Sequence, residues 1–291
     1  MFKGAITALI TPFKNGKVDE QKLAANVEFQ IKNGINGLVP CGTTGESPTL
    51  SHEEHKKVIE IVIAAAKKRV PVIAGTGSNS TEEALELTAH AKKAGADAAL
   101  IVSPYYNKPT QKGLYLHFKT IAEKTAIPII LYNIPGRCGV TIEASTMARL
   151  SAIKNIVGVK EATGSLDMVS QIINACGFGF DVLSGDDNLT LPIMSVGGRG
   201  VISVISNLVP KQVAEMAAAY AKGEHKKALE IHYSLFPLMK AAFIETNPIP
   251  IKTALKLAGM DSGEMRLPMC EMEPENEKKL SEVLKKMKLL Q

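Results

Sequence analysis

Eight short apolar runs, each separated from the next by a helix-sized segment, constrain the fold of this chain more than any other feature. The runs are residues 5–10, 37–40, 70–74, 98–102, 127–131, 156–159, 180–183 and 200–204. They recur at intervals of roughly 20 to 35 residues, the size of a strand–helix unit. Most are apolar at successive positions, as is typical of strands buried on both faces of a parallel sheet. We therefore predict an α/β fold, a closed (β/α)₈ barrel of the TIM type.

Helical patterns occupy the intervals between the runs. Residues 19–33, 53–68 and 81–93 have apolar side chains at helical spacing. Ser51-His-Glu-Glu54 and Ser80-Thr-Glu-Glu83 both match the capping-box pattern at a helix start.

An open doubly wound sheet is the alternative fold. Such a sheet usually has a glycine-rich dinucleotide loop after its first strand, and none is present here. From about Gly223 the pattern becomes wholly helical. We therefore predict a barrel over residues 1–223 and a C-terminal helical extension over residues 224–291, packed beside the barrel.

Composition argues against several classes of protein. The net charge of +5 is spread over helical segments that also carry acids, so we expect no nucleic-acid partner. No apolar run approaches the ~20 residues that span a membrane, and the N-terminus lacks a charged-then-apolar leader. The four cysteines are far apart without a CxxC pair, which favours reduced thiols. We expect a cytoplasmic protein, with Cys138 a passive thiol.

One lysine stands where the catalytic groups of such barrels gather. Lys160 closes the apolar run that begins at Ile156, and active sites lie at the carboxyl ends of barrel strands. Burial of an amine is costly, but desolvation makes an amine a better nucleophile. The position favours Schiff-base chemistry; a lysine that reaches solvent just past the strand end is the alternative.

Residues after other runs bring hydroxyl, phenol and guanidinium groups to the same face. The turn at 41–47 contains paired threonines and many backbone N–H groups, which suit a carboxylate; an ordinary Gly/Thr turn is the alternative. Tyr105 and Tyr106 offer phenols for proton transfer, or pack at a subunit interface. Tyr132 ends its run as Lys160 does, and Arg137 is a candidate clamp for a carboxylate, or a surface arginine.

The sequence contains no pattern for a metal or an organic cofactor. His52 and His55 stand in HEEH, which is not the HExxH zinc motif. A nucleophile elbow and a phosphate loop are absent. We expect imine chemistry without a cofactor and without a metal.

Six motifs together resemble the dihydrodipicolinate synthase (4-hydroxy-tetrahydrodipicolinate synthase) family. They are GTTGES at 42–47, SPYYNKP at 103–109, YNIPGRCG at 132–139, VKEATG at 159–164, LSGDD at 183–187 and GGRGVIS at 197–203. The resemblance covers nearly the whole chain. It implies condensation of pyruvate with L-aspartate 4-semialdehyde, the first committed step of lysine and diaminopimelate biosynthesis.

The resemblance also implies roles for single residues. Lys160 would form the pyruvate imine, and Tyr132 and Thr44 would relay protons with Tyr106 from a neighbouring subunit. The substrate-binding residues would be Thr43, Thr44, Arg137, Gly185 and Ile202, with Arg137 on the semialdehyde carboxylate. The family implies a homotetramer, a dimer of dimers; dimers are the alternative.

A feedback site for lysine is a separate expectation. The positions that resemble those of feedback-sensitive members are Ser47, His52, His55, Asn79, Glu83 and Tyr105. Pro48 stands where alanine is often found. Helix caps and polar interface contacts are the alternative explanation for these residues.

Two other functions stay open. One is another Schiff-base aldolase of the superfamily, such as N-acetylneuraminate lyase or a keto-acid sugar aldolase; Arg137 and the Tyr105–Tyr106 pair favour the synthase. The other is a catalytically inactive barrel used as a binding module. The presence of Lys160, Tyr132, Thr44 and Tyr106 argues against it.

Overall fold

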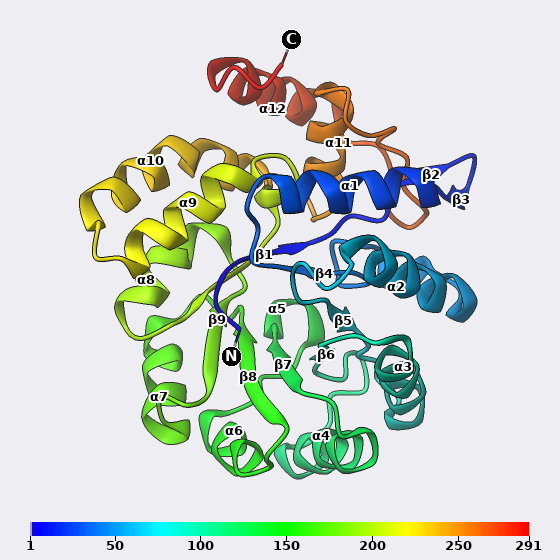
Figure 1. The fold of residues 1–291 in the computed structure, drawn as a ribbon, viewed down its shortest axis with the longest axis vertical. Helices are drawn as coiled ribbons and strands as arrows, with labels where there is room; N and C mark the ends of the chain where they lie inside the picture. The colour runs from blue at the N-terminus through cyan, green and yellow to red at the C-terminus, as the bar shows by residue number, and fades with distance from the viewer. Residues whose placement is uncertain (1, 291) are drawn as a thin grey trace.

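Eight parallel strands form the centre of the molecule in the computed structural model, which describes residues 2–290 (Figure 1). In sequence order they are β1 (Gly4–Ala8), β4 (Gly37–Val39), β5 (Ile73–Gly75), β6 (Ala98–Val102), β7 (Ile129–Asn133), β8 (Ile156–Glu161), β9 (Asp181–Ser184) and β10 (Gly200–Ser203). The spatial order is β4-β1-β10-β9-β8-β7-β6-β5. A parallel bridge between Leu38 and Val72 joins the two ends of this sheet. The predicted (β/α)₈ barrel is confirmed, and the open sheet is excluded.

A helix follows each of these strands and packs on the outside of the barrel (Figure 1). The helices are α1 (Glu20–Lys32), α2 (His52–Ala66), α3 (Thr81–Ala94), α4 (Gln111–Thr125), α6 (Ala144–Ser151), α7 (Leu166–Cys176), α8 (Thr190–Ser195) and α9 (Pro210–Ala221). Short elements lie in the loops: the β2 (Phe13–Lys14) and β3 (Lys17–Val18) hairpin, α5 (Pro135–Cys138), η1 (Ser47–Thr49), η2 (Asp187–Leu189) and η3 (Ile205–Asn207).

Three further helices form the C-terminal extension. They are α10 (His225–Ala241), α11 (Ile249–Leu257) and α12 (Pro274–Lys286). Helix α10 packs against α9, and α12 packs against both α10 and α11. None of the helices within residues 2–290 is both long enough and apolar enough to cross a membrane.

Apolar side chains fill both sides of the strands. A cluster inside the barrel includes Ile6, Ile130, Tyr132, Leu183 and Ile202. Larger clusters fill the space between strands and helices. Because both faces of each strand are covered, the strands are apolar at successive positions, as predicted.

Strand β7 lies two residues later than predicted, at Ile129–Asn133 instead of 127–131. Pro128 has no backbone N–H for the sheet, although its carbonyl accepts a hydrogen bond from Ala99 N at 2.8 Å. The shift places Tyr132 and Asn133 within the strand. This matters for the site, because it pairs Tyr132 with a residue of β8.

One of the two predicted capping boxes is complete. At the start of α2, Ser51 Oγ accepts from Glu54 N and Ser51 N donates to Glu54. At the start of α3, Ser80 Oγ accepts from Glu83 N at 3.4 Å, but Ser80 N donates to Ser78 Oγ. The hydrogen bond from Ser80 N to the Glu83 carboxylate, predicted for the second box, is therefore wrong. The Glu83 carboxylate binds Ser78 and His52 instead.

Candidate active site

Lys160 and Tyr132 lie side by side at the carboxyl ends of β8 and β7. The register of the two strands pairs them directly, and Lys160 Nζ is 4.3 Å from the centre of the Tyr132 ring. Each is 5% exposed. Residues paired in register project from the same face of a sheet, and both Tyr132 and Leu183, which flank Lys160 on the neighbouring strands, belong to the cluster inside the barrel. The Lys160 amine is therefore inside the barrel and not in solvent.

Glu161 and Asn133 hold the ends of the same two strands together, although neither was predicted as a site residue. Asn133 Nδ2 donates to Glu161 Oε2 at 2.9 Å, and Thr163 N donates to Glu161 Oε1 at 2.7 Å. Asn133 Oδ1 also accepts from Ile142 N at 2.9 Å, which ties down the loop that carries Arg137. Burial raises the pKa of Glu161, and these hydrogen bonds oppose the rise.

The predicted Gly185 directly follows β9, and the predicted Ile202 lies in β10, on the side of the barrel next to β8. A Cβ added to Gly185 would stand 2.5 Å from Ala162 Cβ. Only glycine therefore fits at position 185, beside the end of β8. Ile202 is fully buried in the interior. Asp187 joins the two strand ends, since its carboxylate accepts from Ser203 Oγ and from Val204 N. Burial raises the pKa of Asp187.

The predicted threonines occupy a tightly packed turn after β4. Thr44 is 2% exposed, whereas Thr43 is only partly buried and lines a cavity. The turn begins and ends in left-handed backbone, with φ of 56° at Cys41 and 54° at Glu46. Glu46 is anchored by a buried ion pair with Lys252 Nζ at 2.7 Å. The turn is therefore held by residues far away in the sequence.

Arg137 stands at the mouth of the barrel, on the short helix α5. Its side chain is exposed, and Nη2 donates to the backbone carbonyl of Asn247 at 3.0 Å. Asn247 Nδ2 in turn donates to Thr44 Oγ1 at 3.0 Å. Asn247 was not among the predicted site residues. In the sequence it stands in Asn247-Pro-Ile-Pro250, where two prolines interrupt the C-terminal helical pattern.

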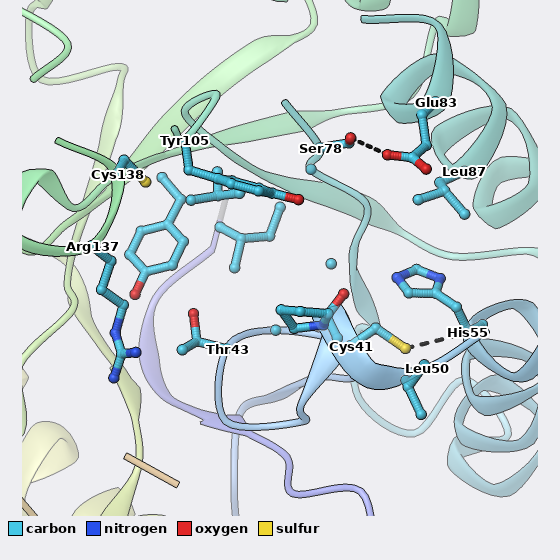
Figure 2. A pocket seen from close by; sticks show the side chains of 18 of the residues that line it. Cys41, Thr43, Leu50, His55, Ser78, Glu83, Leu87, Tyr105, Arg137 and Cys138 are labelled. Atoms are coloured by element: carbon cyan, nitrogen blue, oxygen red, sulfur yellow. Dashed lines mark hydrogen bonds between the residues drawn. The ribbon is translucent and has the colours of Figure 1, made fainter. Parts of the chain in front are cut away.

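A cavity of about 350 Å³ begins at this mouth (Figure 2). Thr43, Tyr132 and Arg137 line one part of it, and Ser78, His55 and Glu83 line another. Tyr105 lies between Arg137 and the Ser78–Glu83 pair in Figure 2. Lys160 and Thr44 are not among the residues that line this cavity.

Most of the residues predicted for lysine binding line the same cavity. They are Ser47, His52, His55, Glu83 and Tyr105. Asn79 does not line it; its carbonyl accepts a hydrogen bond from Asn107 Nδ2 at 2.9 Å. His52 Nε2 is 2.7 Å from Glu83 Oε1. The neighbouring Ser78, which the sequence did not single out, donates to the other oxygen of Glu83.

Burial decides the ionisation of two groups in the cavity wall. It lowers the pKa of His55 to about 4, with help from the charges of His52 and His90. The ring is therefore neutral near pH 7. Burial also raises the pKa of the Cys138 thiol, although Ser103 and Arg137 oppose this rise. All four cysteines carry free thiols.

The two adjacent tyrosines have different surroundings. Tyr105 is 36% exposed and lines the cavity, whereas Tyr106 is 89% exposed. Tyr106 also has left-handed backbone, with φ of 71°, which is uncommon for a residue other than glycine. Within its own chain, Tyr106 does not reach the buried site.

Metal-ligating side chains are scattered. Within residues 2–290, no three His, Cys, Asp or Glu side chains gather in an arrangement that could hold a metal ion.

The fold and these side chains define a class of (β/α)₈-barrel enzymes in which a buried lysine and tyrosine meet at the carboxyl ends of neighbouring strands. The chain matches the model of the dihydrodipicolinate synthetase family over residues 1–287. A 4-hydroxy-tetrahydrodipicolinate synthase from Syntrophus aciditrophicus is 58% identical over 284 residues, 98% of each chain.

Solved structures agree with this match. Dihydrodipicolinate synthase from Aquifex aeolicus has a TM-score of 0.98 at 56% identity, with 99% of each chain covered. The enzyme from Cyanidioschyzon merolae with lysine bound has a TM-score of 0.96 at 40% identity, again with 99% of each chain covered. The chain belongs to the dihydrodipicolinate synthetase family and is a lyase, so the predicted family is confirmed.

Proposed function

We propose that the enzyme condenses pyruvate with L-aspartate 4-semialdehyde to give 4-hydroxy-tetrahydrodipicolinate, the first committed step of lysine and diaminopimelate biosynthesis. The names of its full-length relatives support this reaction. The observation that carries the proposal is the Lys160 amine, buried inside the barrel 4.3 Å from the Tyr132 ring.

Lys160 supplies the nucleophile. Its amine adds to the keto carbon of pyruvate, and loss of water leaves an imine at Nζ. The cationic imine draws electrons from the adjoining methyl carbon, which loses a proton and attacks the aldehyde carbon of the semialdehyde. The semialdehyde amine then displaces the Lys160 nitrogen, which closes the ring and frees the enzyme.

These steps need proton transfers in a site closed to bulk water. A tyrosine alone is a poor base because the usual phenol pKa is ~10. We propose a relay in which Tyr132 and Thr44 exchange protons with Tyr106 of a neighbouring subunit. The 2% exposure of Thr44 and the 5% exposure of Tyr132 suit a relay protected from solvent.

Carboxylate binding is assigned by position. Thr43 and Thr44, with the backbone N–H groups of their turn, bind the pyruvate carboxylate. The exposed Arg137 guanidinium binds the semialdehyde carboxylate at the mouth. Backbone groups at Gly185 and Ile202 line the lysine pocket.

Borohydride trapping tests the imine. Incubation with pyruvate and borohydride should place one reduced pyruvyl group on Lys160, seen by intact mass and peptide mapping, and Lys160→Ala should remove it. Lys252 is a control within the same chain, because it is fully buried but ion-paired and should stay unlabelled. No adduct, or an adduct on another lysine, would contradict the proposal and support the inactive binding module.

The second substrate is tested by activity. Turnover with aspartate semialdehyde and not with N-acetylneuraminate supports the synthase; the reverse result identifies the other aldolase of the superfamily.

We also propose that L-lysine inhibits the enzyme by binding beside Glu83. A relative has been solved with lysine bound, and in this chain the Glu83 carboxylate lines the cavity between His52 and Ser78. The carboxylate suits the ligand's amino group, and Tyr105, next to Tyr106, links the pocket to the relay.

Inhibition curves check this second proposal. Glu83→Gln should weaken inhibition by lysine, whereas Glu86→Gln, on the same helix and paired with Lys56, should not. A flat curve for the unmodified enzyme at millimolar lysine would remove the feedback site from the proposal.

A further inference from the structure

The segment between α10 and α11 brings a buried asparagine into the site. Asn247 is 5% exposed. Its side-chain amide and its backbone carbonyl bind two different residues of the proposed site. Its side-chain Nδ2 donates to Thr44 Oγ1 at 3.0 Å. Its backbone carbonyl accepts from Arg137 Nη2 at 3.0 Å.

The contact with Thr44 fixes the direction of a hydroxyl group. An amide nitrogen can only donate, so Thr44 Oγ1 is the acceptor in this hydrogen bond. The single proton of the hydroxyl must then point elsewhere. Thr44 is 2% exposed, so bulk water does not compete for that proton.

We infer that Asn247 is a positioning residue, which holds the Thr44 hydroxyl as a donor toward the relay and holds Arg137 at the mouth. The inference rests on the proposed relay and names what sets its direction. In a chain of hydroxyls, each oxygen must accept from one neighbour and donate to the next. A reversed Thr44 would interrupt that order.

The position of Asn247 is fixed from several sides. Pro248, Ile249 and Pro250, which follow it, are buried. Five residues on, Lys252 Nζ donates to Thr11 O at 2.9 Å and is paired with Glu46, in the turn that carries Thr44. The amide and the hydroxyl therefore sit on two segments that are anchored to each other.

The orientation of the amide can be tested because its reversal has the opposite consequence. Oδ1 of Asn247 has no hydrogen-bond partner among residues 2–290. If the amide were reversed, Thr44 would donate to Oδ1, and an aspartate would serve as well as the asparagine. In the orientation observed, an aspartate could only accept, so the Thr44 hydroxyl would donate its hydrogen bond to the aspartate and not to the relay.

Two substitutions separate these cases. Asn247→Ala should lower kcat about tenfold, the size expected for one hydrogen bond. Asn247→Asp should lower it further, about a hundredfold, the lower limit for losing general acid–base catalysis. The solvent deuterium isotope effect on kcat should rise in both, because proton transfer becomes more limiting. Asn276→Ala, on α12 with its amide on Glu245, is the matched control and should leave kcat unchanged.

Several outcomes would overturn the inference. They are an Asn247→Asp variant as active as the unmodified enzyme, or a loss of kcat that only follows a loss of thermal stability with no change in isotope effect. Borohydride trapping keeps the two proposals apart. An adduct on Lys160 of the unmodified enzyme with unaffected Asn247 variants defeats this inference alone, whereas no adduct in the unmodified enzyme defeats the proposed function and the inference with it.

Discussion

Two buried lysines have different neighbours, in keeping with the different roles that we propose for them. Lys252 is fully buried, with the Glu46 carboxylate 2.7 Å from its amine. Lys160 is 5% exposed and faces the ring of Tyr132. The Lys252 amine is committed to an ion pair that links two segments of the chain, whereas we propose that the Lys160 amine reacts with substrate. Burial alone would not have distinguished the two residues.

His55 makes stability depend on pH in a defined direction. Its pKa is about 4 in the folded chain, against ~6.5 for an exposed histidine. On acidification the unfolded chain therefore takes up this proton first, so the free energy of unfolding falls as the pH drops from about 6.5 toward 4. The contribution is fully present above pH 6.5.

The measurement is the melting temperature between pH 7.5 and pH 4.5. His55→Gln should flatten the decline with falling pH, because glutamine does not titrate. His225→Gln, at an exposed position on α10, should keep the original slope. Equal slopes for the unmodified protein and His55→Gln would contradict the assignment.

At the scale of elements, helix α11 is attached to the turn after β4 by a buried charge network. Lys252 pairs with Glu46, and the other oxygen of Glu46 accepts from Arg266 N at 3.1 Å. The Phe13 ring lies 4.4 Å from both the Lys252 amine and the Arg266 guanidinium. The C-terminal extension thus supports the turn that presents Thr43 and Thr44.

Removal of one partner of this ion pair should be more damaging than removal of both. Lys252→Met leaves the Glu46 carboxylate buried without its cation and should lower the free energy of unfolding by about 3–5 kcal/mol. The Lys252→Met/Glu46→Gln double variant should recover part of the loss. Chemical denaturation measures both. A Lys252→Met variant as stable as Lys256→Met, an exposed lysine on the same helix, would show that the pair contributes nothing.

Local sequence patterns misplaced one element next to the site and missed another. The apolar run at 127–131 predicted a strand two residues too early, since Pro128 cannot donate to the sheet. Arg137 lies in the short helix α5, for which no helical pattern was predicted. Both differences lie beside the site, where they set the directions of Tyr132 and Arg137.

At the scale of the whole molecule, Tyr106 is the strongest argument for an assembly. The Tyr106 side chain is 89% exposed, and its backbone has the left-handed conformation. We propose a homotetramer built from dimers, in which this tyrosine completes the relay of the adjoining subunit. A single chain would then lack one member of the relay.

Mixed oligomers test this arrangement. Tyr106→Phe and Lys160→Ala should each have little activity alone, but subunits mixed after dissociation should regain activity. An intact Tyr106 from the Lys160→Ala subunit would then enter the intact Lys160 site of the other. Lys160→Ala mixed with Tyr132→Phe is the control and should stay inactive, because those two residues belong to one chain's site. Hybrids that form, as shown by mass, without recovered activity would contradict the proposal.

The sequence by itself determined the barrel and most of the side chains at its mouth. Apolar periodicity is local, and the ends of parallel strands must converge on one face, so Lys160, Tyr132 and the turn that contains Thr44 could be expected near one another. Their proposed roles came from the resemblance of six motifs to a known family. Only the tertiary structure decided the register that pairs Tyr132 with Lys160 and the contact of Asn247 with Thr44. It also decided that the Glu83 carboxylate accepts a hydrogen bond from Ser78 in the cavity and not from the backbone N–H of Ser80. These depend on atoms that come together only when the barrel closes and the extension packs against it, and no local pattern records such distances.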